Sequence, residues 1–284
     1  MNTVPENRHL AGKVAWVTGS SRGIGRVIAS HLASLGAAVA VHGTTPLSTR
    51  AFGEGESLAA LAHEIEQNQQ VQALAVHGDL SDEAAVKRIA TEIRTRLGRI
   101  DILVNCAGGD IGAQGVSAPG AGKPQQNNAL SISLADIQSV LARNLMTCIL
   151  CCREVAPEMM ERHAGRIVNI GSVAGMEGVE EGAIYATAKA AVHEYTRCLA
   201  VLLRPYNVLA NVVAPGYTVT PRVVAYLTSD GTIDDELMVD GGTLVRYARP
   251  IEIARAVEFF VSENNTFTTG QVWRVDGGQQ TWPS

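Results

Sequence analysis

Short runs of β-branched and apolar residues alternate along the chain with longer, alanine-rich stretches of helical periodicity. The apolar runs are nearly continuous, which is typical of strands covered on both faces of a sheet. Seven strands are predicted, at 13–19, 37–43, 71–80, 100–109, 165–173, 207–216 and 270–278. Six helices are predicted between them, at 24–35, 56–69, 82–97, 134–163, 185–203 and 250–262.

This alternation predicts an α/β fold, a Rossmann-like doubly wound seven-stranded parallel sheet flanked by helices. No shift of composition and no internal repeat divides the 284 residues, so we expect a single domain with a flexible N-terminus at 1–10. Three segments do not fit the alternation: 44–55, 109–130 and 217–248. Each follows the C-terminal end of a predicted strand, where open α/β sheets bind ligands. They are candidate lids or specificity loops, although 109–130 is equally consistent with a tolerated, floppy insertion.

Composition narrows the possible partners. The formal net charge of -5 leaves no basic face for nucleic acid or an anionic membrane, so neither is expected as a partner. The N-terminal residues lack the basic start and apolar run of a secretory signal, and no apolar stretch is long enough to span a bilayer. A cytoplasmic protein is therefore expected.

The five cysteines form no paired framework, and three of them, Cys148, Cys151 and Cys152, share one helix face. The spacing between the first two raises the question of a metal site. No second Cys/His pair follows it, so we expect apolar packing, reduced thiols and no metal.

The first predicted strand ends in a glycine-rich turn, "VTGSSRGIG" at 17–25, which leads directly into a helix. Gly19, Gly23 and Gly25 let the backbone turn tightly and approach a pyrophosphate, while the helix N-terminus offers free amides and a partial positive charge. The spacing G-x3-G-x-G differs from the usual dinucleotide fingerprint, and a glycine cluster after a strand can also be a simple turn.

The end of the second strand bears on the choice of dinucleotide. An acidic residue there would accept hydrogen bonds from the ribose of NAD, but His42, Gly43, Thr44 and Thr45 occupy these positions. Arg22, within the glycine turn, can engage a 2′-phosphate, or it can be a solvated loop charge. We therefore expect NADP(H) to be preferred over NAD(H).

Residues 183–191 read "AIYATAKAA", which places Tyr185 and Lys189 on the same side of a helix. An ammonium close to a phenol favours the phenolate, as a general acid/base requires. The surrounding alanines would leave room for a flat ligand. The same pair also occurs on amphipathic helices, with the lysine solvated and the ring half buried.

Two further polar residues are candidates for the same site. Ser172 lies just beyond a predicted strand, where its hydroxyl could hold a carbonyl or alkoxide oxygen. Asn144 stands amid apolar residues in "LARNLMTC", either as a satisfied buried amide or as a group that holds a water relay.

Taken in order, "TGSSRGIG", "GDL", "NCAG", "RNL", "IGSVAG", "YATAK", "NVVAPG" and "VDGG" resemble the short-chain dehydrogenases/reductases from Gly12 to Gly278. The chain is most similar to the 3-oxoacyl-acyl-carrier-protein reductase type. The resemblance implies a dinucleotide-binding catalytic domain that transfers a hydride between nicotinamide and a carbonyl or secondary alcohol.

The resemblance also implies roles for single residues. Tyr185 would be the general acid/base, Lys189 would bind the nicotinamide ribose, and Ser172 would orient the reacting oxygen. Asn144 would hold the water that links the lysine to solvent. Tyr185, Lys189 and the following residues would contact the cofactor: Gly19, Ser21, Arg22, Gly23, Ile24, Gly25, Gly43, Thr44, Asp79, Leu80, Asn105, Ala107, Gly108, Pro215, Gly216, Thr218 and Thr220.

The chain departs from the family pattern at two places. Cys106 replaces the usual second asparagine of the "NNAG" stretch, and the loop after it is longer, an insertion at 109–133. Because the insertion lies where substrate would enter, the fatty-acyl specificity of relatives need not carry over. An acyl-carrier-protein thioester usually requires a basic docking patch, so we expect a small polar ketone or sugar-like alcohol, with 3-oxoacyl-acyl-carrier-protein reduction as the alternative. Acidic residues in the substrate-covering loop 217–248 would suit a polar substrate, or they form a solvated face.

A protein of another class, a catalytically silent cofactor-binding sensor, would be expected to lack at least one of Asn144, Ser172, Tyr185 and Lys189, and all four are present. Members of the family mostly assemble as tetramers through the two helices that carry Asn144 and Tyr185. Apolar residues there exceed what one sheet face needs, which predicts a homotetramer: Leu145, Ile149, Val192, Leu199 and Leu203.

Overall fold

The computed structural model describes residues 8–231, 234–238 and 242–281. Most of the N-terminal segment expected to be flexible, residues 1–7, lies outside the described residues, as do parts of the expected substrate-covering loop. Leu10, at the end of the N-terminal segment, is buried, and its N–H donates to the carbonyl of Leu35.

The sheet confirms the predicted architecture. All seven strands are present and pair in parallel in the order β3-β2-β1-β4-β5-β6-β7. Their bounds are β1 Val14–Thr18, β2 Ala38–Gly43, β3 Ala73–His77, β4 Ile102–Asn105, β5 Gly165–Ile170, β6 Val208–Pro215 and β7 Val272–Val275. The strand order changes direction between β1 and β4, and this switch point opens a crevice at the C-terminal ends of the strands.

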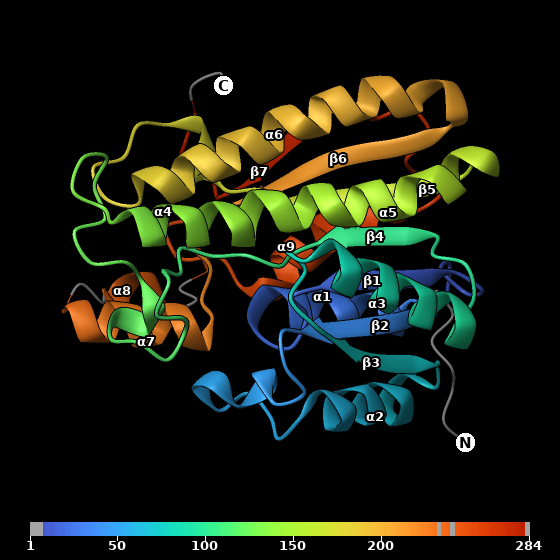
Figure 1. Cartoon of the computed structure of the whole chain (residues 1–284), viewed down its shortest axis with the longest axis horizontal. Coiled ribbons are helices and arrows are strands. Elements are labelled where there is room, and N and C mark those ends of the chain that lie inside the picture. The colour runs from blue at the N-terminus through green and yellow to red at the C-terminus, as the bar shows by residue number, and fades with distance from the viewer. Residues whose placement is uncertain (1–7, 232–233, 239–241, 282–284) are drawn as a thin grey trace.

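Helices cover both faces of the sheet (Figure 1). On one face, α1 (Gly23–Ser34) packs against α9 (Pro250–Val261), and both bury apolar residues in one core cluster. On the other face, α3 (Glu83–Arg96), α5 (Thr147–Glu161) and α6 (Ala183–Leu203) share a second cluster. The helix α2 (Leu58–Gln69) packs on β2 and β3.

The helix expected at 134–163 is interrupted. It consists of α4 (Leu134–Leu141), a π-helical turn (Ala142–Met146) and α5. Among the described residues, the stretch Leu134–Glu161 is the one helix long and apolar enough to cross a membrane by length and composition. The cysteine-bearing face of α5 is buried against the sheet, so core packing accounts for its apolar character.

The segment 217–248 differs from the expected loop. It contains α7 (Pro221–Asp230) and α8 (Asp235–Met238). The start of α7 follows from local chemistry: Thr220 Oγ1 accepts from the N–H of Val223 at 3.3 Å, and Pro221 stands at the first helical position.

The insertion at 109–133 has one short 3₁₀ turn (Gly120–Gly122) and is held by internal backbone hydrogen bonds, such as that from Gly112 N to Gly122 O at 2.9 Å. It packs against α7, and Figure 1 shows the two side by side at the end of the molecule. This packing favours the interpretation of the segment as a lid or specificity loop over its interpretation as a tolerated, floppy insertion.

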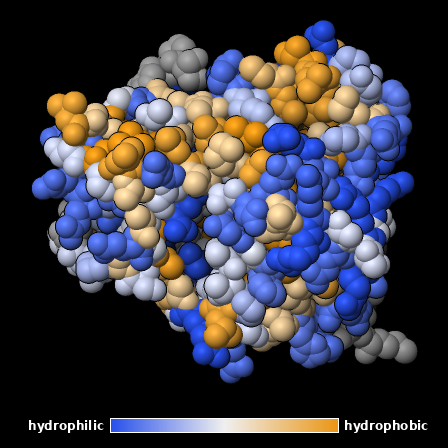
Figure 2. Space-filling view, in the orientation of Figure 1, coloured by the Kyte–Doolittle hydropathy of each residue, from blue (hydrophilic) through white to orange (hydrophobic). Residues whose placement is uncertain are grey.

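The apolar residues expected at a subunit interface are mostly core residues of the protomer. Val192, Leu199 and Leu203 are buried in the second core cluster, which accounts for their apolar character without a partner. Large exposed apolar side chains do occur on α4 to α6: Leu134, Met146, Val201 and Leu202. Hydrophobic residues gather in the upper part of the face drawn in Figure 2, over the region of these helices in Figure 1.

Candidate active site

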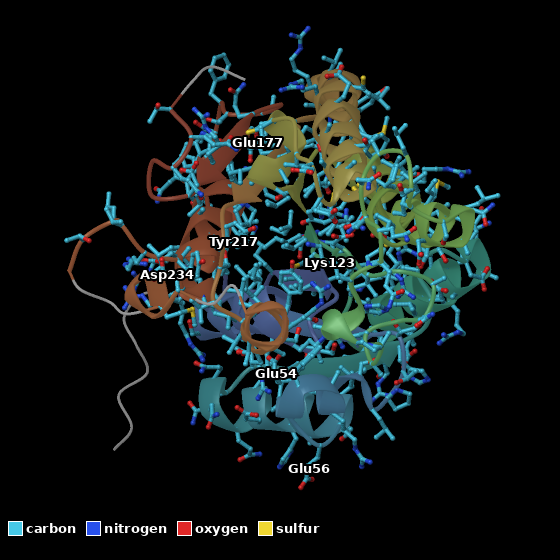
Figure 3. All side chains as sticks on the ribbon, turned by 90° about the vertical axis from the view of Figure 1, so that its left-hand side faces the viewer. Glu54, Glu56, Lys123, Glu177, Tyr217 and Asp234 are labelled. Carbon is cyan, nitrogen blue, oxygen red and sulfur yellow. The ribbon has the colours of Figure 1, made fainter. Side chains whose placement is uncertain are left out.

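The C-terminal ends of the strands border a cleft of about 590 Å³. Figure 3 looks onto this end of the molecule, with Lys123, Tyr217 and Glu54 around its middle. Every residue that the sequence indicated for catalysis or cofactor binding lines this cleft except Asn105 and Asn144. Residues as far apart in the sequence as Gly19 and Thr220 therefore meet, because parallel strands end at one edge of the sheet.

The glycine turn brings two chain segments unusually close together. A Cβ atom on Gly19 would lie 2.6 Å from the Cα of Ala107, and Gly19 has a φ of +64°. Only glycine therefore allows the end of β1 to pass this close to the segment after β4. The cleft floor is a backbone surface at this point, as close approach of a pyrophosphate requires.

His42 holds the glycine turn in place, a role that sequence reasoning missed. Its Nδ1 accepts from the N–H of Gly19 at 3.1 Å, and its Nε2 donates to the carbonyl of Gly78 at 3.0 Å. Burial lowers the pKa of His42 to about 4, so the ring is neutral at pH 7 and keeps the acceptor that Gly19 needs. Histidine at the end of a strand carries no sequence signal that distinguishes this role.

Glu54 was also missed, because it lies in the irregular segment 44–55. Its Oε2 accepts from the N–H of Gly23, the first residue of α1, at 2.7 Å. A carboxylate thus occupies the anion site that the helix N-terminus and the glycine turn create. The donor set therefore fits a negatively charged group, as a dinucleotide phosphate would supply.

Arg22 lies beside this anion site and lines the cleft. Its Nη1 donates to the carbonyl of Ser48 at 3.0 Å, so it is not a freely solvated loop charge. Burial lowers the pKa of Arg22, while the nearby Glu54 opposes that shift.

Tyr185 and Lys189 both reach the cleft from the first turns of α6. Lys189 is only 5% exposed, its Nζ donates to the carbonyl of Ile170 at 2.9 Å, and that nitrogen lies 5.6 Å from the centre of the Tyr185 ring. These contacts rule out the solvated lysine of an ordinary amphipathic helix. The alanines, in contrast, do not open space in the cleft, since Ala186 and Ala188 are buried and line no part of it.

Ser172 follows β5 and caps the short 3₁₀ helix Val173–Met176. Its Oγ accepts from the N–H of Ala174 at 3.2 Å, which leaves the hydroxyl hydrogen free to donate into the cleft. Its backbone N–H points to Nε2 of His193 at 3.4 Å. Ser172, Tyr185 and Lys189 are thus brought to one wall.

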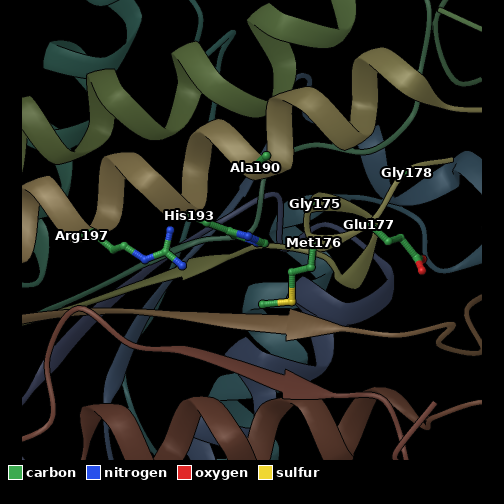
Figure 4. Close-up of a pocket in the computed structure, with 7 residues that line it drawn as sticks. All are labelled: Gly175, Met176, Glu177, Gly178, Ala190, His193 and Arg197. Atoms are coloured by element: carbon green, nitrogen blue, oxygen red, sulfur yellow. The ribbon is translucent and has the colours of Figure 1, made fainter. Parts of the chain in front are cut away.

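Behind that wall lies a second cavity of about 430 Å³, lined by the 175–178 segment and by α6 (Figure 4). The imidazole of His193 lies between α6 and this segment, near Met176. Burial lowers the pKa of His193 to about 4, and the positive charges of Lys189 and Arg197 add to this shift. A neutral ring therefore supports the loop that carries Ser172.

Asn144 is the buried residue of the π-helical turn. Its Oδ1 accepts from the N–H of Gly109, and its Nδ2 donates to the carbonyls of Gly109 and Val140, each at 2.9 Å. The side-chain amide is therefore satisfied by backbone and anchors the segment after β4. π-helical turns of this kind are frequent at functional sites.

Asn105 lies behind the cleft wall. Its Nδ2 donates to Oδ1 of Asn169 at 2.9 Å and to Sγ of Cys152 at 3.3 Å, so the side chain ties β4 to β5 and α5. The expected cofactor contact of Asn105 has no counterpart in the lining of the cleft. Its neighbours Ala107 and Gly108 do line it.

The far end of the cleft is closed by the insertion and α7. Nζ of Lys123 donates to the hydroxyl of Tyr226 at 2.7 Å and lies 4.5 Å from the centre of that ring. Arg222 donates from Nε to the carbonyl of Ala121 at 3.0 Å and from Nη2 to that of Asp110 at 2.6 Å. These contacts join two segments about a hundred residues apart in the sequence into one cover.

Comparisons with known proteins agree with this arrangement. Residues 13–230 match the family model for short chain dehydrogenases. The cyclohexanol dehydrogenase of Rhodococcus sp. (strain TK6) is 36% identical over 281 residues, which cover 96% of this chain and 98% of the relative. The 3-oxoacyl-[acyl-carrier-protein] reductase of Aquifex aeolicus (strain VF5) is 36% identical over 269 residues, covering 95% of this chain and 98% of the relative.

A solved structure shows the same likeness in three dimensions. The gluconate 5-dehydrogenase of Burkholderia cenocepacia J2315, in complex with NADP and tartrate, superposes with a TM-score of 0.79 at 30% identity and covers 96% of each chain. The family match, the whole-length relatives and the fold agree: the chain belongs to the short-chain dehydrogenases/reductases, oxidoreductases that act on CH–OH groups.

Proposed function

We propose that the protein is an NADP(H)-dependent oxidoreductase that interconverts a small polar ketone and its secondary alcohol, with Tyr185 as the general acid/base. The observation that carries this proposal is the buried, hydrogen-bonded Lys189 beside Tyr185, in the same cleft as the glycine turn. When bound, the nicotinamide would supply or accept the hydride.

The side chains of the protein would supply the proton and orient the reacting oxygen of the substrate. The phenol of Tyr185 gives its proton to the developing alkoxide in reduction, and its deprotonated oxygen takes the proton of the alcohol in oxidation, with the ammonium of Lys189 beside the ring. The Ser172 hydroxyl donates to the same oxygen and orients it. Asn144 anchors the Gly109 backbone beside them, and we propose that it also holds the water that relays protons from Lys189 to solvent.

The preference for NADP(H) rests on charge at the ribose end of the cleft. Residues 43–45 bring no carboxylate there, and Arg22 brings a guanidinium. The Burkholderia cenocepacia relative was solved with NADP. The negative charge of Glu54 disfavours a 2′-phosphate. The preference for NADP(H) therefore depends on whether the phosphate displaces the Glu54 carboxylate from the Gly23 N–H.

The substrate is proposed to be small and polar because the cover formed by the insertion and α7 contributes Asp110, Lys123, Arg222 and Tyr226 to the cleft. The relatives include enzymes named for cyclohexanol and for gluconate. Reduction of a 3-oxoacyl thioester is the second candidate, supported by the equally similar Aquifex aeolicus relative.

We further propose that the protein works as a cytoplasmic homotetramer without nucleic-acid or membrane partners. The exposed apolar residues of α4 to α6 are the surface that would be covered. Sedimentation as a monomer at micromolar concentration would contradict the tetramer.

A panel of small cyclic ketones, sugar-derived ketones, neutral diketones and a 3-oxoacyl thioester tests the proposal, with NADPH and NADH compared by absorbance. We expect turnover of polar ketones with NADPH in excess of that with NADH. Turnover of the thioester alone would favour the second candidate. Cofactor binding without oxidation by any member of the panel would indicate the catalytically silent alternative.

A further inference from the structure

The guanidinium of Arg222 has one side that no described residue binds. Nε and Nη2 donate to the backbone carbonyls of Ala121 and Asp110, and these two bonds fix the plane of the group. Nη1 forms no hydrogen bond with any described residue, and it lies 3.7 Å from the Cβ position of Gly109, beside the wall of the cleft. Arg222 itself lines the cleft, so this nitrogen faces the space where substrate would lie.

Arg222 also lacks a paired counter-charge. Within the described part of the chain its hydrogen bonds go only to carbonyls, and no carboxylate forms an ion pair with it. Burial lowers the pKa of Arg222, which shows that the cation is held at a cost, and Asp110 and Tyr185 are the groups close enough to oppose this shift. A half-buried cation without an ion-pair partner among the described residues favours the arrival of an anion.

Charges of both signs lie at this end of the cleft, and the carboxylates of Asp110 and Glu181 do not form an ion pair with Arg222 among the described residues. Oδ2 of Asp110 accepts from Nδ2 of Asn127 at 2.6 Å, so that oxygen is already engaged, and burial raises the pKa of Asp110. Glu181 also lines the cleft but is exposed to solvent, which screens its charge. Lys123 adds a second cation, held by Tyr226.

From this geometry we infer that the substrate carries a carboxylate, which binds Nη1 of Arg222 while the ketone oxygen meets Tyr185 and Ser172. The inference rests on the proposed function and names its substrate class, an oxo acid or hydroxy acid. Arg222, Tyr185 and Ser172 line the same cleft, so one small molecule could reach the anion site and the proton donors together. Arg222 is then a specificity-determining residue.

The test compares short oxo acids with the methyl ester of each, because the ester keeps the size and removes the charge. We expect kcat/KM of the wild type with NADPH to be about tenfold or more higher for the best acid than for its ester. In Arg222→Gln the ratio of kcat/KM for the acid to kcat/KM for its ester should fall toward one, mainly because the KM of the acid rises. Arg222→Lys should recover part of the preference for the acid.

The matched control is Arg204→Gln, which removes an exposed arginine outside the cleft and should preserve the preference. Thermal unfolding and NADPH binding of each variant show whether Arg222→Gln remains folded. Equal rates for acid and ester in the wild type, or equal losses on both in Arg222→Gln, would overturn the inference. Turnover of neutral ketones without turnover of acids would overturn it and leave the proposed function standing, whereas no turnover of any ketone would overturn both.

Discussion

The carboxylate of Glu54 accepts a hydrogen bond of 2.7 Å from the backbone N–H of Gly23, at the point where α1 begins. A side chain from the segment 44–55 therefore occupies the amide that would otherwise be free for a phosphate. The same carboxylate lies close enough to Arg22 to oppose the lowering of its pKa by burial. Glu54 thus competes with a phosphate for an amide and a cation together.

Glu54→Gln should strengthen NADPH binding about five- to tenfold, because a neutral amide competes less well for the Gly23 N–H and does not neutralise Arg22. Fluorescence titration with NADPH and NADH measures the effect. Glu56→Gln is the matched control, since Glu56 is exposed and lines no part of the cleft. Weaker NADH binding in Glu54→Gln, with no gain for NADPH, would instead make Glu54 an acceptor for ribose hydroxyls.

Tyr185→Phe should lose nearly all turnover and keep cofactor binding, because the phenol hydroxyl is the proton donor and the ring still fills its place on α6. A fall of about a thousandfold or more in kcat is expected, in line with loss of general acid catalysis in a closed site. The decisive comparison is steady-state turnover against NADPH affinity for the same preparation. A variant that retains near wild-type turnover would remove Tyr185 from the proposed mechanism.

The stability of the fold should fall as the pH is lowered from about 6.5 to 4. His42 and His193 have a pKa of about 4 in the folded protein, while the value in the unfolded chain is 6.5. Between these values the unfolded chain binds more protons, so each histidine removes about 3 kcal/mol of unfolding free energy by pH 4. Urea unfolding at a series of pH values measures the slope.

His42→Gln isolates the contribution of one of these rings, since glutamine does not titrate. The variant should be less stable at pH 7, because the Gly19 and Gly78 contacts are disturbed, but its unfolding free energy should depend less steeply on pH. An unchanged slope in His42→Gln would show that His42 is not the group that titrates.

Asn144→Ala should lower the free energy of unfolding by about 2–4 kcal/mol, because it removes three hydrogen bonds to the backbone of Gly109 and Val140 inside the protein. Asn128→Ala is the control, since Asn128 accepts only from exposed backbone N–H groups of Leu130 and Ser131. If the two variants differ by less than about 0.5 kcal/mol in urea unfolding, Asn144 does not anchor this segment.

The sheet and most of the candidate site could be predicted from the sequence because their signals are local. Continuous apolar runs identify buried strands. The residues after each run meet at the C-terminal edge of the parallel sheet, independently of the conformation of the loops. The pair Tyr185 and Lys189 needed only the helical repeat. The π-helical turn at 142–146 contains no Pro or Gly, so the periodicity of the sequence did not reveal it.

The contributions of Glu54, His42 and Arg222 could not be predicted for a different reason. Each acts through a backbone group that is distant in sequence, such as the Gly23 amide for Glu54 and the Asp110 carbonyl for Arg222. No spacing rule links such partners, because the loop conformation that brings them together depends on the whole fold. Two of the alanines around Tyr185, Ala186 and Ala188, are buried by helix packing, so they need no ligand to explain them.

The bonds from Arg222 to Ala121 and Asp110 have a consequence for how specificity can change in this family. A loop that makes no side-chain contacts with other elements can be exchanged between relatives without further changes. Here two side chains hold the insertion on α7: Arg222 donates to the carbonyls of Ala121 and Asp110, which any residue could supply, and Lys123 donates to the hydroxyl of Tyr226. If residues 109–133 were transferred into a relative, the α7 residues that bind them would therefore have to be transferred as well.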